Sequence, residues 1–207
     1  MVCLPAAAGA DGDPASDVLI SDTLFLPYQP PSGGSVTKLR RAIDALRKAG
    51  QPVRVAIIGS QQDLGAVANL YGHPREYARL LGQELGNPVE AEARGHREEL
   101  IVVMEAGYGT NGVSPAVERE LRAVELPSGA SPDELAAAAG YGVQVLARST
   151  GRRLPVEFEK PKAGGGGGAL TAVLVIAALL VLVALLIALR VRSARQAEPI
   201  QSPGGNA

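Results

Sequence analysis

The longest apolar stretch of the chain lies near its C-terminus and restricts the architecture more than any other feature. From Ala169 to Leu189 the chain runs for about 20 residues without a charged side chain, and Thr171 is the only polar residue in it. A helix rises about 1.5 Å per residue, so this stretch spans the roughly 30 Å hydrocarbon core of a bilayer. A buried helix of a soluble protein rarely runs this long without a polar face. The sequence therefore predicts one transmembrane helix over 169–189.

Charges on the two flanks of this stretch bear on its orientation. Three arginines follow it at once and begin a basic, then polar, tail over 190–207: Arg190, Arg192 and Arg195. A linker over 152–168 precedes it and ends in the tether Gly164–Gly168. Because cytoplasmic flanks carry an excess of Lys and Arg, we expect a cytoplasmic C-terminus and an extracytoplasmic soluble domain at the cell membrane. A tail-anchored cytoplasmic domain is the alternative, because the linker also carries four basic residues: Arg152, Arg153, Lys160 and Lys162.

The first residues resemble part of a secretion signal. The sequence MVCLPAAAGA is followed by DGDPASD, and its small residues are typical of a signal-peptidase site after Ala10. The apolar stretch before Ala10 is short and lacks a charged start, which a start codon assigned too late would explain. We expect residues 1–16 to be a flexible N-terminus that holds a signal-peptide remnant.

Composition excludes several classes of function. The formal net charge is -1, so the chain lacks the basic field that attracts nucleic acid. Cys3 is the only cysteine, which excludes a disulfide within the chain and a multi-cysteine metal site. His73 and His96 are the only histidines and are not at ligand spacing.

Short apolar runs alternate with helical patterns over 17–151. Val53–Ile58 and Leu100–Met104 are predicted strands, and at least one of Val18–Ile20 and Leu24–Leu26 should be another. Helices are expected to begin at Ser35, Pro74, Ser114 and Ser131, and Leu154–Phe158 is a candidate for a late edge strand. This alternation predicts an α/β domain with a small three- or four-stranded sheet flanked by helices.

A glycine-rich motif follows the most apolar predicted strand. Residues 107–112, GYGTNG, match the G-x-G-x-x-G pattern of dinucleotide-binding domains. The next helix begins too late for the third glycine to pack within it, and no strand ending in Asp or Glu follows at the required distance. We therefore interpret the motif as a glycine-rich turn in which Asn111-Gly112 supplies the positive φ. Five residues of this turn are candidates to line a cleft for a ligand or partner segment: Gly107, Tyr108, Gly109, Asn111 and Gly112.

Three aspartates are candidates for a metal site. Asp17, Asp22 and Asp63 fall beside predicted strands, where their carboxylates could converge on a divalent cation. Ordinary loop and capping roles are the alternative for all three. No catalytic residue is predicted, because the chain has no Gly-x-Ser-x-Gly motif and its loop serines have no nearby histidine.

The order of these motifs resembles the TPM domain, a family named after a thylakoid lumen protein, a photosystem repair factor and a receptor-associated membrane protein. The similarity covers roughly Asp17 to Thr150. The matching segments are PVRVAIIG for an early strand, EYARLLGQELG for the next helix, EAGYGTNG for the glycine turn and ELAAAAGYGVQVLA for the closing helix. The family usually has two strands between its early helix and the glycine turn, whereas this chain has only LIVVM there. The order is also similar to that of small uncharacterised single-pass membrane proteins of high-GC bacteria.

The resemblance implies an extracytoplasmic α/β domain that acts on membrane protein complexes. Some members are reported to have weak acid phosphatase activity and to bind calcium, but their acidic sites are not recognisable in this chain. The hypothesis is therefore a membrane-anchored binding or scaffolding module, with a weak divalent-cation-dependent phosphatase as the alternative. Its expected partners are the lipid bilayer, through Ala169 to Leu189, and another membrane or envelope protein, without nucleic acid. Only the alternative requires a cofactor, the divalent cation.

Overall fold

A computed structural model describes residues 12–86 and 98–162 of the chain. The predicted transmembrane segment at 169–189 lies outside these residues, as does most of the N-terminal segment 1–16. Among the helices within the described ranges, none has the length and apolar character needed to cross a bilayer.

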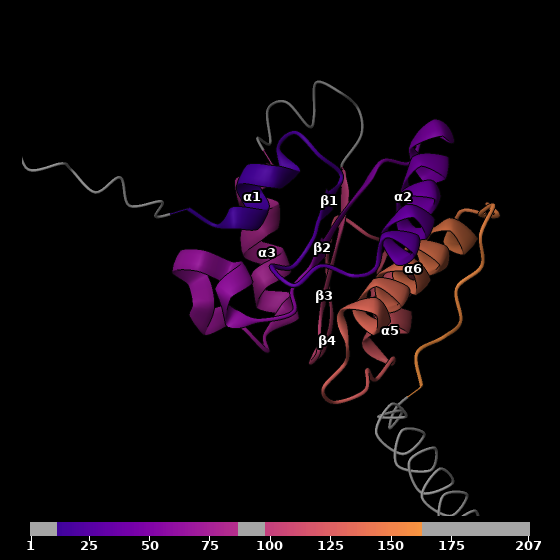
Figure 1. The fold of residues 1–207 in the computed structure, drawn as a ribbon. Coiled ribbons are helices and arrows are strands. Elements are labelled where there is room, and N and C mark those ends of the chain that lie inside the picture. Colours follow the sequence, from indigo (N-terminus) through magenta and orange to yellow (C-terminus); the bar gives the residue numbers. More distant parts are fainter. Residues whose placement is uncertain (1–11, 87–97, 163–207) are drawn as a thin grey trace, which may run out of the picture. The chain divides into compact units, whose positions relative to one another are not determined.

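The described residues form a mixed α/β structure around a four-stranded sheet (Figure 1). The strands are β1 (Leu24–Phe25), β2 (Val53–Ile57), β3 (Glu99–Met104) and β4 (Gly107–Asn111), and they are ordered β1-β2-β3-β4. β1, β2 and β3 are parallel to one another, and β4 is antiparallel to β3. The expectation of an α/β domain with three or four strands flanked by helices is confirmed, at four strands.

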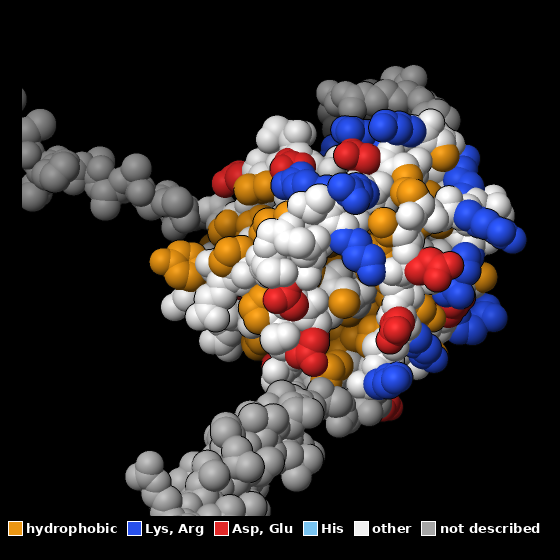
Figure 2. Space-filling model, turned by 45° about the vertical axis from the view of Figure 1, so that its right-hand side comes forward, with side chains coloured by type: hydrophobic (Ala, Val, Ile, Leu, Met, Phe, Trp, Pro, Cys, Tyr) orange, Lys and Arg blue, Asp and Glu red, His pale blue; other side chains and the backbone are white. Residues whose placement is uncertain are grey.

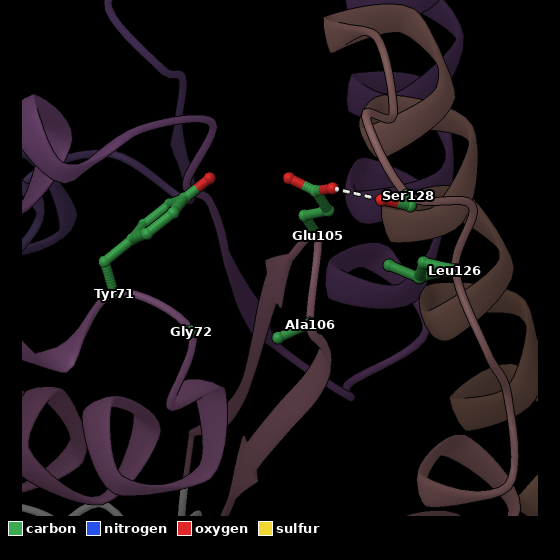
Figure 3. Close-up of a pocket in the computed structure, with 6 residues that line it drawn as sticks. All are labelled: Tyr71, Gly72, Glu105, Ala106, Leu126 and Ser128. Atoms are coloured by element: carbon green, nitrogen blue, oxygen red, sulfur yellow. Dashed lines mark hydrogen bonds between the residues drawn. The ribbon is translucent and has the colours of Figure 1, made fainter. Parts of the chain in front are cut away.

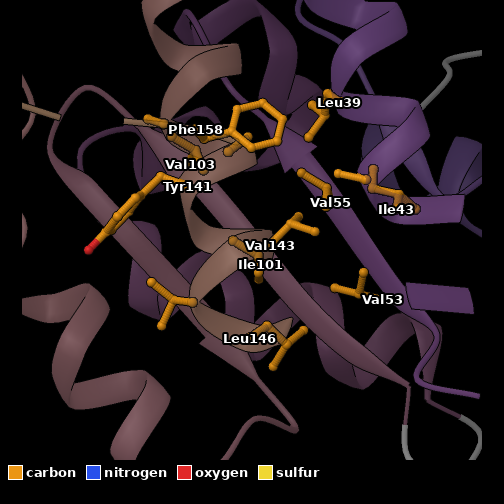
Figure 4. Close-up of a cluster of buried hydrophobic side chains, with 14 of the residues drawn as sticks. Leu39, Ile43, Val53, Val55, Ile101, Val103, Tyr141, Val143, Leu146 and Phe158 are labelled. Carbon is orange, nitrogen blue, oxygen red and sulfur yellow. The ribbon is translucent and has the colours of Figure 1, made fainter. Parts of the chain in front are cut away.

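Helices cover both faces of the sheet, as Figure 1 shows. One face carries α2 (Gly33–Lys48), α5 (Pro115–Arg122) and α6 (Pro132–Ser149). The other carries α1 (Pro14–Leu19), the 3-10 helix η1 (Gln61–Leu70) and α3 (Pro74–Leu85). Each face has its own hydrophobic core, and alternate residues of β2 and β3 point into each one. Figure 4 shows the first core, where Val55 and Ile101 meet Ile43 and Val143. A central strand buried on both faces requires apolar side chains on both, and β3 is apolar at each of its buried positions, Leu100 to Met104.

Helix starts follow the sequence signals closely. The Ser131 hydroxyl accepts a hydrogen bond from Glu134 N, and the Glu134 carboxylate accepts one from Ser131 N. This capping box begins α6, and prolines begin α3 and α5 as predicted. The first of the four helices begins earlier than expected, because Ser32 rather than Ser35 caps α2.

The two crossover connections of the parallel strands have opposite handedness. The chain moves from β1 to β2 and then from β2 to β3, one step in the same direction each time. The first connection passes through α2 on one face, and the second passes through η1 and α3 on the other. Two connections that step the same way on opposite faces must differ in hand, so one of them is of the rare left-handed kind. As a result, the chain leaves the carboxyl ends of β1 and β2 toward opposite faces.

One local prediction is confirmed and another is wrong. Of the two early apolar runs, the second supplies β1, whereas Val18 of the first belongs to α1, because Asp13 caps a helix there and Pro14 begins it. The glycine motif is not a turn: it forms β4, and the hairpin turn lies before it at Glu105-Ala106. The positive φ angles belong to Gly107 and Gly112, and Asn111 has none.

An extended segment after α6 packs back onto the helices. We call residues Arg152–Phe158 the strap. The Phe158 ring lies against Gly140 of α6 and beneath the Lys38 ammonium of α2, 4.6 Å from its centroid. The Gln144 side chain donates to Phe158 O at 3.2 Å and accepts from Phe158 N at 2.8 Å. The strap therefore continues the packed structure as far as Phe158.

Candidate functional site at the carboxyl edge of the sheet

Two pockets at the carboxyl ends of the parallel strands make up the candidate site. Ligands of open α/β sheets bind where adjacent connections leave toward opposite faces, because a crevice forms between them. Here that place is the end of β1 and β2. A pocket of about 170 Å³ lies there, between the two connections and the start of α6. Its lining comes from Pro27, Tyr28 and Gln29, from Gly59, Ser60, Gln62 and Asp63, and from Ala130, Pro132 and Leu135.

Asp63 holds this crevice in shape. Its side chain is 4% exposed, and its Oδ2 accepts hydrogen bonds from Gly59 N at 2.9 Å and Ser60 N at 2.7 Å. Its Oδ1 accepts from Tyr28 N at 2.6 Å. One carboxylate thus satisfies backbone groups of two loops that diverge to opposite faces.

Tyr28 borders the crevice with an exposed ring. Its side chain is 82% exposed, the highest value among the large hydrophobic residues that the structure describes as exposed. Its backbone is held by Asp63, so the ring projects from a fixed position. Exposed aromatic rings on rigid backbone are typical of binding surfaces.

A second, larger pocket of about 330 Å³ lies beyond the end of β3 (Figure 3). Its lining is the turn Glu105-Ala106, the pair Tyr71-Gly72 before α3, and Leu126 and Ser128 before α6. The Tyr71 hydroxyl donates to Gly59 O at 3.1 Å, and Gly59 lines the first pocket. Tyr71 therefore connects the two pockets along one edge of the sheet.

The charges around Tyr71 are negative. Burial raises the pKa of the Tyr71 hydroxyl above its usual value, and the carboxylates of Glu105 and Asp63 raise it further. The phenol consequently stays protonated at neutral pH and acts as a hydrogen-bond donor. Figure 3 shows the Tyr71 hydroxyl and the Glu105 carboxylate directed toward one another across the pocket.

The glycine-motif residues serve packing in this structure. Gly107, Tyr108 and Gly109 are buried, and the Tyr108 hydroxyl donates to Ala138 O at 2.7 Å. A Cβ at residue 109 would lie 1.8 Å from Pro74 O, so glycine is required where α3 approaches the strand. Asn111 packs closely on Gly82 of α3, and Gly112 ends the strand beside Glu98. The five candidates, Gly107, Tyr108, Gly109, Asn111 and Gly112, line neither of the two pockets.

The three aspartates proposed as metal ligands are not brought together. Asp22 precedes β1 and forms a salt bridge with Arg40, whereas Asp63 follows β2 at the opposite end of the parallel strands. The hydrogen bonds from Arg40 hold the pKa of Asp22 below its usual value. Asp17 lies in the first turn of α1. Within residues 12–86 and 98–162, no three His, Cys, Asp or Glu side chains are grouped as a metal site would need.

Sequence reasoning missed Tyr28, Tyr71 and Glu105. Glu105 directly follows the most apolar predicted strand, so its place at a strand end could have been recognised. The tyrosines had no such signal, because the sequence does not show to which face each connection turns.

Comparison with known proteins supplies no relative. No protein-family model matches the chain, and neither a curated protein nor a solved structure does.

Proposed function

We propose that this chain is a membrane-anchored module that binds a segment of another envelope protein along the carboxyl edge of its sheet. In this proposal Ala169 to Leu189 is the anchor, the domain faces outward and the C-terminus is cytoplasmic. The observation that carries the proposal is the crevice between the β1 and β2 connections, bordered by the exposed ring of Tyr28. Aromatic side chains beside a preformed hollow contribute most of the binding energy in many interfaces.

The polar groups of the edge also favour binding. Ser60 and Asp63 hydrogen-bond one another, and Ser128 donates to Glu105 at 3.2 Å. These contacts hold the loops in one conformation, and a rigid surface loses little entropy when a partner docks. The resemblance of the element order to the TPM domain supports a role on membrane protein complexes.

Site-specific photocrosslinking tests the binding surface. In the full-length chain in its own membrane, Tyr28 is replaced by p-benzoylphenylalanine, and exposed Lys48 of α2 serves as the control position. The expected result is an adduct with an envelope protein at position 28 that is missing at position 48. No adduct at position 28, or the same adducts at both positions, would contradict the proposal.

Protease accessibility tests the orientation. Cells stripped of their wall are treated with protease before and after lysis, and the domain is followed with an antibody. Digestion of the domain in unlysed cells is expected. Protection until lysis would place it in the cytoplasm.

A further inference from the structure

One carboxylate oxygen of Glu105 is directed into the larger pocket. Ser128 Oγ and Gly129 N both donate to its Oε1. Among the described residues no hydrogen bond reaches Oε2, which Figure 3 shows on the side of Tyr71. The carboxylate is thus oriented by its loop and keeps one acceptor for a ligand.

The walls around this oxygen are largely apolar. Leu126 and Ala106 line one part of the pocket, and the Tyr71 side chain lines another. An alkyl stem can pack on such walls while its charged end reaches the carboxylate, as the stems of Lys and Arg do. An aromatic side chain beside the carboxylate adds attraction for a cation.

The connections at this edge carry charge of one sign, although Arg75 of α3 and Arg122 of α5 lie in the neighbouring helix ends. The connections over 26–32, 58–73, 105–106 and 123–131 contain three acidic residues and no Lys or Arg: Asp63, Glu105 and Glu125. The first turn of α6 adds Asp133 and Glu134. In Figure 2 the lower left of the domain shows acidic and hydrophobic side chains without Lys or Arg, which gather at the top and right. This edge therefore attracts cationic groups.

We infer that the larger pocket binds a basic side chain, Lys or Arg, of a partner segment whose neighbouring residues lie in the first pocket beside Tyr28. The inference rests on the proposed function and adds the chemistry that the site recognises. A protein segment fits better than a free amine, because Tyr71 links the two pockets into one continuous edge. An extended chain can occupy both pockets at once.

Selection from a random heptapeptide library tests the inference. The bait is the full-length protein in lipid nanodiscs, and the readout is the residue frequency at each peptide position. Enrichment of Lys or Arg at one position is expected with the wild type. Selection with Glu105→Gln should lose that enrichment, whereas selection with the control Glu157→Gln, an exposed glutamate of the strap that lines neither pocket, should retain it.

The affinity of one selected peptide for the wild type and for Glu105→Gln then tests whether its basic residue contacts Glu105. Replacing its basic residue by norleucine should weaken binding to the wild type at least 10-fold and leave binding to Glu105→Gln unchanged. Glutamine keeps an oxygen for Ser128 Oγ and Gly129 N, so the loop is preserved. Equal thermal unfolding midpoints of the variant and the wild type would verify this.

The outcomes separate the two proposals. Peptides that bind in a Tyr28-dependent manner without an enriched basic residue would overturn the inference and leave the proposed function standing. Failure to enrich any peptide, together with no adduct at position 28, would overturn both. Glu105-dependent binding of n-butylamine with no peptide bound would overturn the assignment to a protein segment.

Discussion

Asp63 Oδ1 accepts a hydrogen bond of 2.6 Å from the backbone N–H of Tyr28, which joins the β1 connection to the β2 connection. The same carboxylate accepts from Gly59 and Ser60. An Asp63→Ala variant leaves these donors in a buried site without their acceptor. We expect it to lower the free energy of unfolding by about 3 kcal/mol.

Urea denaturation of Asp63→Ala and Asp63→Asn would check this expectation. The asparagine variant retains one acceptor oxygen and should lose less stability than the alanine variant. Equal losses in the two variants would show that the carboxylate acts through something other than these hydrogen bonds.

Substitution of Gly109 is expected to destabilise the fold, because α3 packs directly against it. A Cβ there would lie 1.8 Å from Pro74 O and 2.9 Å from Ala78 Cβ, so α3 would have to shift. Gly109→Ala is expected to lower the free energy of unfolding by about 2–3 kcal/mol. Gly34→Ala is the matched control, because open space surrounds Gly34 in α2, and it should raise stability by about 0.5 kcal/mol. Similar effects of the two substitutions in thermal unfolding would contradict the packing argument.

The strap gives a prediction about local opening. Phe158 is 7% exposed and packs on Gly140, so Phe158→Ala is expected to weaken strap docking by about 2 kcal/mol. That change raises the undocked population roughly 30-fold, and trypsin cleavage at Arg152 and Arg153 should accelerate accordingly. Substitution of exposed Glu157 by Ala serves as the control. Unchanged cleavage of the Phe158 variant would mean that the ring does not hold the strap.

We expect Asp13 and Asp22 to change the stability of the fold with pH in opposite directions. Burial raises the pKa of Asp13 above its usual 3.8, although Tyr77 and Ala15 donate to it. A raised pKa stabilises the fold most below the unfolded value, and this contribution is lost as the pH rises through the folded value. The pKa of Asp22 is lowered, chiefly by hydrogen bonds from Arg40, so its contribution is present above 3.8 and lost as the pH falls.

Unfolding of the wild type and of single Asn variants between pH 3 and 7 tests this pair. Relative to Asp13→Asn, the wild type should become less stable as the pH rises from about 3.8, the ordinary Asp value. Relative to Asp22→Asn, it should keep a constant advantage above about 3.8 and lose that advantage as the pH falls below this value. Parallel curves for all three proteins would contradict both assignments.

Strong local signals predicted much of the fold. The apolar runs of β2 and β3, the capping box of α6 and the prolines of α3 and α5 need only neighbouring residues, and the structure has these elements where expected. β4 could not be predicted this way, because Gly107 and Gly109 disfavour a strand by propensity. Tertiary packing of α3 overrides that preference and makes Gly109 necessary.

The candidate site was harder to predict than the fold. Its residues come from four connections. The faces of the two that follow β1 and β2 depend on the handedness of the crossovers, which a sequence pattern does not show. The three aspartates were expected to converge because Asp22 would have followed a strand at Val18–Ile20. Val18 belongs to α1 instead, so Asp22 precedes β1 and lies at the opposite end of the parallel strands from Asp63. Glu105 was missed as well, although its place directly after a predicted strand was a usable signal.

The packing of the strap also sets the length of chain that separates the domain from the predicted membrane segment. If Ala169 to Leu189 spans the bilayer, the 10 residues 159–168 separate it from the strap, and a chain of that length extends at most about 35 Å. Release of the strap would add the 7 residues of Arg152–Phe158 and roughly 25 Å. Under the proposed anchoring, a short connection keeps the domain within reach of membrane partners, whose effective concentration can then reach the millimolar range. Weak contacts suffice under those conditions, and a partner dissolved away from the membrane would not gain the same advantage.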